Sequence, residues 1–480
     1  MALAVVFSAS ASTAGAQSHP IQTAIQEGGA IFDRPTTPLA MAHIRAAGAS
    51  WVRLDVEWRD VAPQGTSKPA GFDASNPGDP NYAWSGLDHA VRQAVASGLT
   101  PFIDISEAPS WAERGGGGRS GVQNPDPGEL AAFARAAALR YSGRYAGLPR
   151  VGAWEVWNEV NASFFFQPQW KGTPGGEALS PVLYRKMVND FAVAVHGVDA
   201  TNLVVAGSLY PFALDRPTGQ AIPPLEFLRD FFCLTKKLRV IPGCGEPVHL
   251  DVLSHHPYTS GEPLHEVLAP DSVSIGQLPR MARLLRAAVR QGRVISRGPV
   301  GFWVTEFGWD TNPPDPQGVP VALHARWISE GLYRMWKAGV SVASYFKMRD
   351  GFGSSRFRDG LFYVCPQDPE NLACDRPKPS FDSFRFPFVA FRRKHRRIYF
   401  WGRVPGSVRG TVVVEQRRRG RYRRVAKLGT DRWGIFQTTL SRRKSSRGGK
   451  LRARLADGSV HSLPFSLKRP ADFPISPPVG

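Results

Sequence analysis

The chain has 480 residues, of which 42% are hydrophobic, enough for two or three domains or for one large barrel with a small module. This composition excludes an intrinsically disordered chain, and beyond the N-terminus no apolar run is long enough to cross a membrane. The formal net charge of +20 is confined to the tail: residues 391–480 carry 24 Lys and Arg against 4 Asp and Glu, whereas residues 1–390 carry 36 of each sign.

The first residues predict a secretory signal over residues 1–17. An apolar run from Met1 to Phe7 is followed by small residues that end in Ala14-Gly15-Ala16-Gln17, a pattern typical of a cleavage region. The usual basic start is missing, which indicates a truncated signal or a start codon placed too late. A loose apolar N-terminus is the alternative. We therefore expect a secreted, extracellular protein.

Between residues 26 and 390, short apolar runs alternate with longer amphipathic stretches. The predicted strands are 29–32, 51–58, 100–105, 151–157, 203–208, 250–255, 302–306 and 342–347. Helices are predicted between them, for example over 86–97, 128–141, 181–196, 277–291 and 322–337. Eight cycles of strand and helix indicate a closed parallel (β/α)₈ TIM barrel rather than an open sheet.

Four cysteines form two close pairs along the chain, Cys233 with Cys244 and Cys365 with Cys374. Three disulfide connectivities are possible, and local pairing is the simplest because each bond would close a short loop. Paired disulfides and secretion support each other. A zinc site is the alternative, but neither pair has CxxC spacing, and we expect no metal.

The basic tail predicts a second, smaller domain with a boundary near residue 390. Short alternating or β-branched runs are separated by turn signals such as Pro405-Gly406 and Asp457-Gly458, which predicts a small all-β sandwich over residues 391–470. Its charge suits an anionic cell wall or an acidic polysaccharide, or serves only as a solvated face. We do not expect a nucleic-acid partner, because no zinc-finger, helix-turn-helix or RNA-recognition signature is present.

Two glutamates end strand-like segments that are rich in tryptophan. Glu159 closes Trp154-Glu155-Val156-Trp157-Asn158-Glu159, and Glu306 lies in Trp303-Val304-Thr305-Glu306-Phe307-Gly308-Trp309. A carboxylate at the end of a buried strand is costly unless it is paired or functional, and a solvated strand end or half of an ion pair is the alternative. The two follow the fourth and seventh predicted strands. We therefore expect them to face each other across the barrel mouth, as the carboxyl pair of a retaining glycosidase does.

These segments resemble the catalytic motifs of clan A glycoside hydrolases, the group that contains families 5 and 39. Trp157-Asn158-Glu159 is similar to the acid/base motif after strand four, and Thr305-Glu306-Phe307-Gly308 to the nucleophile motif on strand seven. The resemblance spans roughly residues 26–390 and implies that Glu159 is the acid/base and Glu306 the nucleophile. It also implies that Asn158 hydrogen-bonds the 2-hydroxyl of the sugar.

Two further matches precede the first glutamate. Arg53, in Trp51-Val52-Arg53-Leu54-Asp55, resembles the second-strand arginine that helps to hold the nucleophile anionic. Neutralisation of Asp55 or Glu57 inside the barrel is its alternative role. Trp111, in Ala108-Pro109-Ser110-Trp111-Ala112, resembles part of a loop that often lines the sugar site, with ordinary loop packing as the alternative.

Other matches lie near the second glutamate. His256 and Tyr258, in Ser254-His255-His256-Pro257-Tyr258, resemble a sixth-strand pattern that reaches the sugar and the nucleophile. His255 is expected to be a core residue or a support for the site rather than a ligand. Trp309 is expected either as a stacking platform for the sugar or as a lid over the core.

One departure concerns the eighth strand, where many clan members place a tryptophan beneath the sugar. The corresponding run here is 344–350, so Tyr345 or Phe346 replaces that tryptophan, or Lys347 projects into the site. The identity of the sugar is therefore not predicted.

The resemblance implies a secreted retaining O-glycoside hydrolase that acts on β-linked oligo- or polysaccharides by double displacement, without a metal or an organic cofactor. A non-catalytic carbohydrate-binding or cell-surface protein on the same barrel is one alternative, although binding alone would not need both carboxylates. A transglycosylase, which prefers a sugar acceptor to water, is another.

Overall fold

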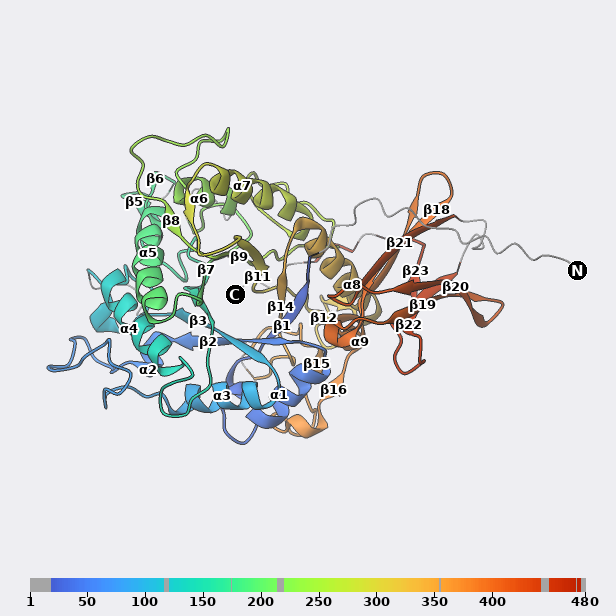
Figure 1. Cartoon of the computed structure of the whole chain (residues 1–480), viewed down its shortest axis with the longest axis horizontal. Helices are drawn as coiled ribbons and strands as arrows, with labels where there is room; N and C mark the ends of the chain where they lie inside the picture. The colour runs from blue at the N-terminus through green and yellow to red at the C-terminus, as the bar shows by residue number, and fades with distance from the viewer. Residues whose placement is uncertain are drawn as a thin grey trace, which may run out of the picture.

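The computed structural model describes residues 19–115, 121–173, 175–213, 220–353, 355–441, 449–471 and 473–475. A barrel and a smaller β-rich domain lie side by side along the long axis of the molecule (Figure 1). The predicted signal over residues 1–17 lies outside the described residues.

Eight parallel strands close the barrel, as predicted. They are β1 (Gln22–Gln26), β2 (Trp51–Glu57), β3 (Thr100–Ser106), β4 (Ala153–Val156), β7 (Leu203–Leu209), β9 (Val252–His255), β11 (Gly301–Val304) and β14 (Val342–Phe346). In β2, β3 and β7, apolar residues occupy more than half of the positions, and most residues are buried. This is the pattern expected of a parallel sheet covered by helices.

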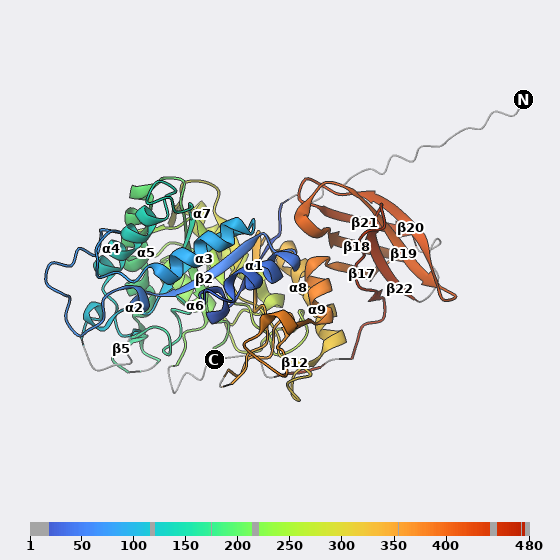
Figure 2. The same cartoon turned by 90° about the horizontal axis from the view of Figure 1, so that it is seen from below.

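Helices cover the outside of this barrel (Figures 1 and 2). The main ones are α1 (Thr37–Ala46), α3 (Ser85–Ala96), α4 (Pro127–Arg140), α5 (Ser180–Val198), α6 (Pro224–Phe231), α7 (Leu278–Arg290), α8 (Val321–Ala338) and α9 (Pro379–Arg385). Their ends follow local chemistry: Asp126 accepts hydrogen bonds from the first backbone N–H groups of α4, and α8 stops at Gly339, whose φ of 100° is left-handed.

The first strand differs from its prediction. The run 29–32 is not a strand; residues Gly29–Ile31 form a 3₁₀ turn, and β1 lies earlier, at Gln22–Gln26. β1 pairs with β14 and β2 although two of its five residues are glutamines. The reason is that Gln26 points to a buried charge at the barrel mouth, where it accepts a hydrogen bond from Arg53. A polar strand of this kind lacks the apolar pattern used to predict strands.

The basic domain contains two antiparallel sheets, packed as neighbouring layers in Figure 2. The first sheet is β17 (Phe388–Arg393), β18 (Arg397–Arg403) and β21 (Ile435–Ser441). The second has the order β20 (Arg421–Gly429), β19 (Thr411–Arg418), β22 (Lys450–Leu455) and β23 (Phe465–Ser466). The β-rich domain was predicted, but the expected boundary at residue 390 falls inside β17, because that strand begins directly after α9.

An aromatic cluster joins the two domains. Trp401 on β18 is fully buried, and its ring lies 5.5 Å from that of Tyr333 and 5.6 Å from that of Trp336, both on α8. Nearer the N-terminus of α8, the guanidinium of Arg326 lies 4.0 Å from the centre of the ring of Phe465 on β23. The β-rich domain is therefore part of the same hydrophobic core as the barrel.

Two disulfides have the predicted pairing. Cys233 bonds to Cys244 with a Cα–Cα distance of 5.7 Å, and Cys365 bonds to Cys374 with 5.2 Å. Both distances lie in the usual range for disulfides. Among the residues described, no helix is long and apolar enough to span a bilayer.

The segment that follows β23 returns to the barrel. Arg469 forms an ion pair with Glu262, and the backbone N–H of Ile475 donates to the carbonyl of Ser260 at 3.0 Å. Both barrel partners belong to the loop after β9. The last described residues thus contact a loop at the mouth of the barrel.

We predict that Trp401→Ala lowers the free energy of unfolding by about 3–5 kcal/mol, because it leaves a cavity between α8 and β18. Urea unfolding monitored by circular dichroism measures this change. Trp433→Ala, at a partly exposed tryptophan of the same domain, is the control and should cost far less. Equal unfolding free energies for wild type and Trp401→Ala would contradict a shared core.

Candidate active site

The two glutamates lie close together at the mouth of the barrel. Glu159 follows β4 and Glu306 follows β11, and both line a cavity of about 240 Å³. Nδ1 of His256 is 3.0 Å from Oε1 of Glu159 and 3.7 Å from Oε2 of Glu306. Since one nitrogen is close to both carboxyl groups, the two are near neighbours.

The backbone after β4 turns Glu159 toward this cavity. Trp157 and Glu159 have positive φ angles of 68° and 42°, which residues other than glycine rarely adopt. Backbone hydrogen bonds hold the turn, from Trp157 N–H to the carbonyl of Ile105 and from Glu159 N–H to that of Ser208. The indole of Trp157 is fully buried and donates to the carbonyl of Phe165. Strain of this kind at a strand end is common at functional sites.

Arg53 on β2 is the buried cation of the site. Its side chain is 1% exposed, and Nη1 lies 2.6 Å from Oε1 of Glu306. Three more carboxyl groups surround it: Glu155 at 2.9 Å, Asp55 at 3.0 Å and Asp104 at 3.6 Å. Burial alone would lower the pKa of Arg53, but these carboxylates raise it well above its ordinary value. The guanidinium is therefore permanently charged.

Glu306 receives two strong donors. Besides Arg53, the hydroxyl of Tyr258 donates to Oε2 of Glu306 at 2.8 Å. Hydrogen bonds to a carboxylate stabilise its charged form. Arg53 and Tyr258 both line the cavity together with Glu306.

Glu159 has a different environment. Burial, with the nearby charge of Glu306, raises the pKa of Glu159 well above its ordinary value, and Arg53 opposes this only in part. Burial and Arg53 lower the pKa of His256, so its ring is neutral. The neutral ring bridges Glu159 and Thr305, whose Oγ1 lies 3.1 Å from Nε2. A carboxyl group in these surroundings can keep a proton near neutral pH.

Asn158 also lines the cavity, next to Glu159. Its Oδ1 accepts a hydrogen bond of 3.3 Å from Nη2 of Arg53. This contact orients the amide at the edge of the cavity where a sugar hydroxyl is predicted to bind.

Three predicted binding residues do not line the cavity. Trp309 is fully buried, donates to the carbonyl of Gly261 and packs on Trp327, so of its two expected places, a sugar platform and the core, its contacts are those of the core. Trp111 is half-buried, and its indole donates to the carbonyl of Pro63. His256 has no exposed surface and contacts Glu159, so it can position that residue.

On the eighth strand, Phe346 is the residue that lines the cavity. Tyr345 is fully buried, and its hydroxyl donates to the carbonyl of Asp359. Lys347 lines a separate hollow beside β1 rather than this cavity. Of the three residues considered for this position, Phe346 is thus the one that lines the cavity.

Sequence reasoning missed several residues of the site. The further lining residues are Gln26, Asp55, Glu57, Asp104, Ser106, Glu107, Phe165, Tyr210 and Phe357. Glu155 does not line the cavity, but it joins Arg53 to the hydroxyl of Ser208 behind it. A usable signal existed for Glu155 and Asp104, because each is a charged residue inside an apolar strand. The described residues include no group of three or more His, Cys, Asp or Glu that could hold a metal ion.

Comparison with known proteins gives no match to a family model or to a curated protein sequence. Solved structures do match. A family 39 glycoside hydrolase from the gut symbiont Bacteroides cellulosilyticus WH2 is 15% identical, with a TM-score of 0.52 over 88% of this chain and 79% of that one. A conserved exported protein from Bacteroides fragilis is 11% identical, with a TM-score of 0.50 over 88% of this chain and 98% of that one.

Identities this low establish the fold and not the activity. The closed parallel barrel, the β-rich C-terminal domain and the similarity over most of both chains agree on that fold. The chain has the fold of the clan A glycoside hydrolases.

Proposed function

We propose that the protein is a retaining O-glycoside hydrolase that acts on β-linked oligo- or polysaccharides. The observation that carries the proposal is the pair of neighbouring carboxyl groups with unlike surroundings. Glu306 contacts a permanent cation and a phenol, whereas Glu159 contacts a neutral imidazole. When two carboxyl groups have different surroundings, one can hold a proton and act as the acid while the other stays ionised and acts as the nucleophile.

In the first step, an oxygen of Glu306 attacks the anomeric carbon while Glu159 gives its proton to the leaving oxygen. The bond from carbon to the leaving group breaks as the ester to Glu306 forms. In the second step, Glu159 takes a proton from water, and that water oxygen displaces Glu306. The proton and the carboxylate are then both restored.

Arg53 and Tyr258 support the nucleophile through this cycle. Both contact Glu306, so its charge is compensated before attack and again when it departs from the sugar. Asn158 lies beside the acid and is proposed to bind the 2-hydroxyl of the sugar. No cofactor enters either step.

We also propose that the enzyme works outside the cell, which the two disulfides support. The charge of its β-rich domain is proposed to hold it on an anionic cell-wall or polysaccharide surface. A panel of p-nitrophenyl β-glycosides and plant polysaccharides identifies the sugar, and product analysis separates hydrolysis from transfer to a sugar acceptor.

Glu306→Ala should lower turnover of an activated aryl β-glycoside on the order of 10⁴-fold, because the covalent intermediate can no longer form. Azide should restore part of the turnover and give a glycosyl azide of the opposite anomeric configuration, detected by NMR. Glu177→Ala, an exposed glutamate outside the cavity, is the control. Full activity in Glu306→Ala would refute the assignment, and sugar binding without hydrolysis by wild type would favour a binding protein.

Glu159→Gln should change the pH profile. Wild-type kcat/KM should fall as pH rises through the raised pKa of Glu159, because the reaction needs its protonated form. The glutamine variant should lose this alkaline limb. It should also lose more activity on substrates with poor leaving groups than on dinitrophenyl glycosides, which need little acid assistance. An alkaline limb unchanged in the variant would assign it to another group.

Arg53→Met should lower the free energy of unfolding at pH 8 by about 3–5 kcal/mol, because it leaves buried carboxylates uncompensated. Burial raises the pKa of Asp55 to about 6 even with Arg53 present, and it raises the pKa of Asp104 as well. A carboxyl group whose pKa is higher in the folded than in the unfolded protein lowers the free energy of unfolding at high pH, where it is ionised. This loss disappears at low pH, where the group is protonated in both states. Urea unfolding should thus show a smaller loss at pH 5 than at pH 8.

Arg283→Met on the exposed face of α7 is the control for this experiment. It should change stability little at either pH. A loss in Arg53→Met that is the same at pH 5 and pH 8 would contradict the role of Arg53 as counter-ion.

A further inference from the structure

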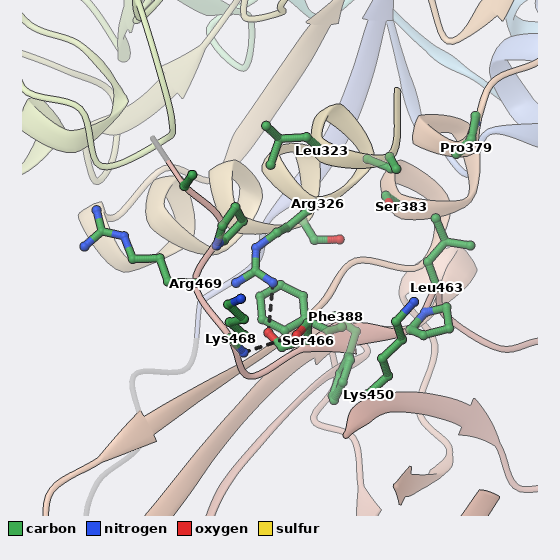
Figure 3. Close-up of a pocket in the computed structure, with 17 residues that line it drawn as sticks. Leu323, Arg326, Pro379, Ser383, Phe388, Lys450, Leu463, Ser466, Lys468 and Arg469 are labelled. Atoms are coloured by element: carbon green, nitrogen blue, oxygen red, sulfur yellow. Dashed lines mark hydrogen bonds between the residues drawn. The ribbon is translucent and has the colours of Figure 1, made fainter. Parts of the chain in front are cut away.

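A second cavity lies between the barrel and the β-rich domain (Figure 3). It has a volume of about 570 Å³, and α8, α9, β17, β22 and the chain around β23 line it. Leu323, Pro464 and Phe465 contribute apolar surface. Its size is within the range of roughly 300–1,000 Å³ typical of ligand pockets.

The charges around this cavity are all of one sign. Arg326, Lys450, Lys468 and Arg469 line it, and no acidic residue is among its described lining residues. Arg326 is held by Glu330 and by the carbonyl of Ser466, each at 2.8 Å, and Arg469 by Glu262. For Lys450 and Lys468, no side-chain ion pair is found within the described part of the chain. Two ammonium groups therefore stand beside an apolar wall.

Lys450 connects the cavity to a basic face of the second sheet. It pairs with Ser466 in the ladder between β22 and β23, and both residues line the cavity. Residues Arg452 and Arg454 follow at alternate positions of β22, so they share the face of Lys450. The alternate residues Leu451 and Ala453 are fully buried.

The strand register extends this face across β19 and β20. Glu415 pairs with Arg452 on one side and Arg424 on the other, and Val413 pairs with Arg454 and Lys427. Directly paired residues project from the same face of a sheet. Arg417 and its partner Tyr422 complete the row. We call these residues the basic face: Val413, Glu415, Arg417, Tyr422, Arg424, Lys427, Lys450, Arg452 and Arg454.

The basic face has six cationic side chains and one carboxylate. Glu415 binds Arg452 at 3.0 Å and Arg454 at 2.8 Å. Arg424 and Lys427 are exposed, and neither has a side-chain ion pair with another described residue. Part of the positive charge of residues 391–480 thus lies on the basic face, which begins at the rim of the cavity.

We propose that the cavity and the basic face form one binding site for a linear acidic polysaccharide. Arginine forks match carboxylate and sulfate groups, which recur along such a chain, and the apolar wall suits the C–H face of a sugar ring. A chain would lie across β20, β19 and β22 with one part seated in the cavity. The site is separate from the catalytic cavity and deepens the proposed surface attachment.

The choice of polysaccharide over nucleic acid rests on the proposed glycosidase function. It is also supported by the composition of the face, where Tyr422 is the single aromatic residue among the paired positions described. Its ring is covered on one side by Arg452 at 3.8 Å. Surfaces that bind single-stranded nucleic acid usually offer several aromatic platforms for successive bases.

Fluorescence anisotropy with labelled oligogalacturonate, at 50 mM and 300 mM NaCl, tests the proposal on the full chain. Two double variants probe the site: Lys450→Glu with Lys468→Glu for the cavity and the rim that it shares with the face, and Arg424→Glu with Lys427→Glu for the part of the face away from the cavity. Each should weaken binding at least about tenfold at low salt and reduce its salt dependence. Arg283→Glu with Arg286→Glu on α7 is the matched control and should stay within about twofold.

All substituted side chains are exposed, and thermal unfolding verifies that the variants fold. Turnover of a small aryl glycoside should equal that of wild type in every variant, so loss of catalysis and loss of polymer binding are separate results. Unchanged affinity in either double variant overturns the single-site proposal. Equal binding of neutral dextran, or tighter binding of duplex DNA with the same dependence on these residues, overturns the polysaccharide assignment.

Discussion

A single buried guanidinium organises the mouth of this barrel. Arg53 on β2 contacts Gln26 on β1, Asp104 on β3, Glu155 on β4 and Glu306 after β11. A buried charge is tolerated only when it is fully paired, so these strand ends must all be correctly placed before Arg53 can be buried. The proposed nucleophile is therefore oriented by the same contacts that satisfy the barrel interior, and the site and the fold share one electrostatic requirement.

The two proposed catalytic carboxyl groups owe their difference to their neighbours. Glu306 contacts a cation, whereas Glu159 contacts an imidazole whose own protonation is suppressed by burial and by that same cation. A protonated His256 would place a positive charge beside Glu159 and favour loss of its proton. Arg53 thus acts on both carboxyl groups: it contacts Glu306, and its charge lowers the pKa of His256 together with burial while directly opposing part of the rise in the pKa of Glu159.

The sequence predicted the barrel, the β-rich domain and the two glutamates, because each depends on local pattern: alternating strands and helices, and apolar runs that end in a carboxylate. It did not predict β1, because Gln26 of this strand is polar and accepts a hydrogen bond from Arg53 on β2. Glu155 stands out as a charge inside an apolar strand, but its role was missed because its partner Arg53 is 102 residues away. Trp309 shows a different limit of sequence patterns. A tryptophan after a strand is compatible with a sugar site or with the core, and only the surrounding structure shows which of the two it occupies.

The return of the chain after β23 has a practical consequence. Ile475 is hydrogen-bonded to Ser260, two residues beyond Tyr258, the phenol that contacts Glu306. The C-terminal segment thus tethers the loop that carries the phenol. Removal of the segment that ends at Ile475 would therefore take a hydrogen bond from the loop after β9 as well as shorten the β-rich domain.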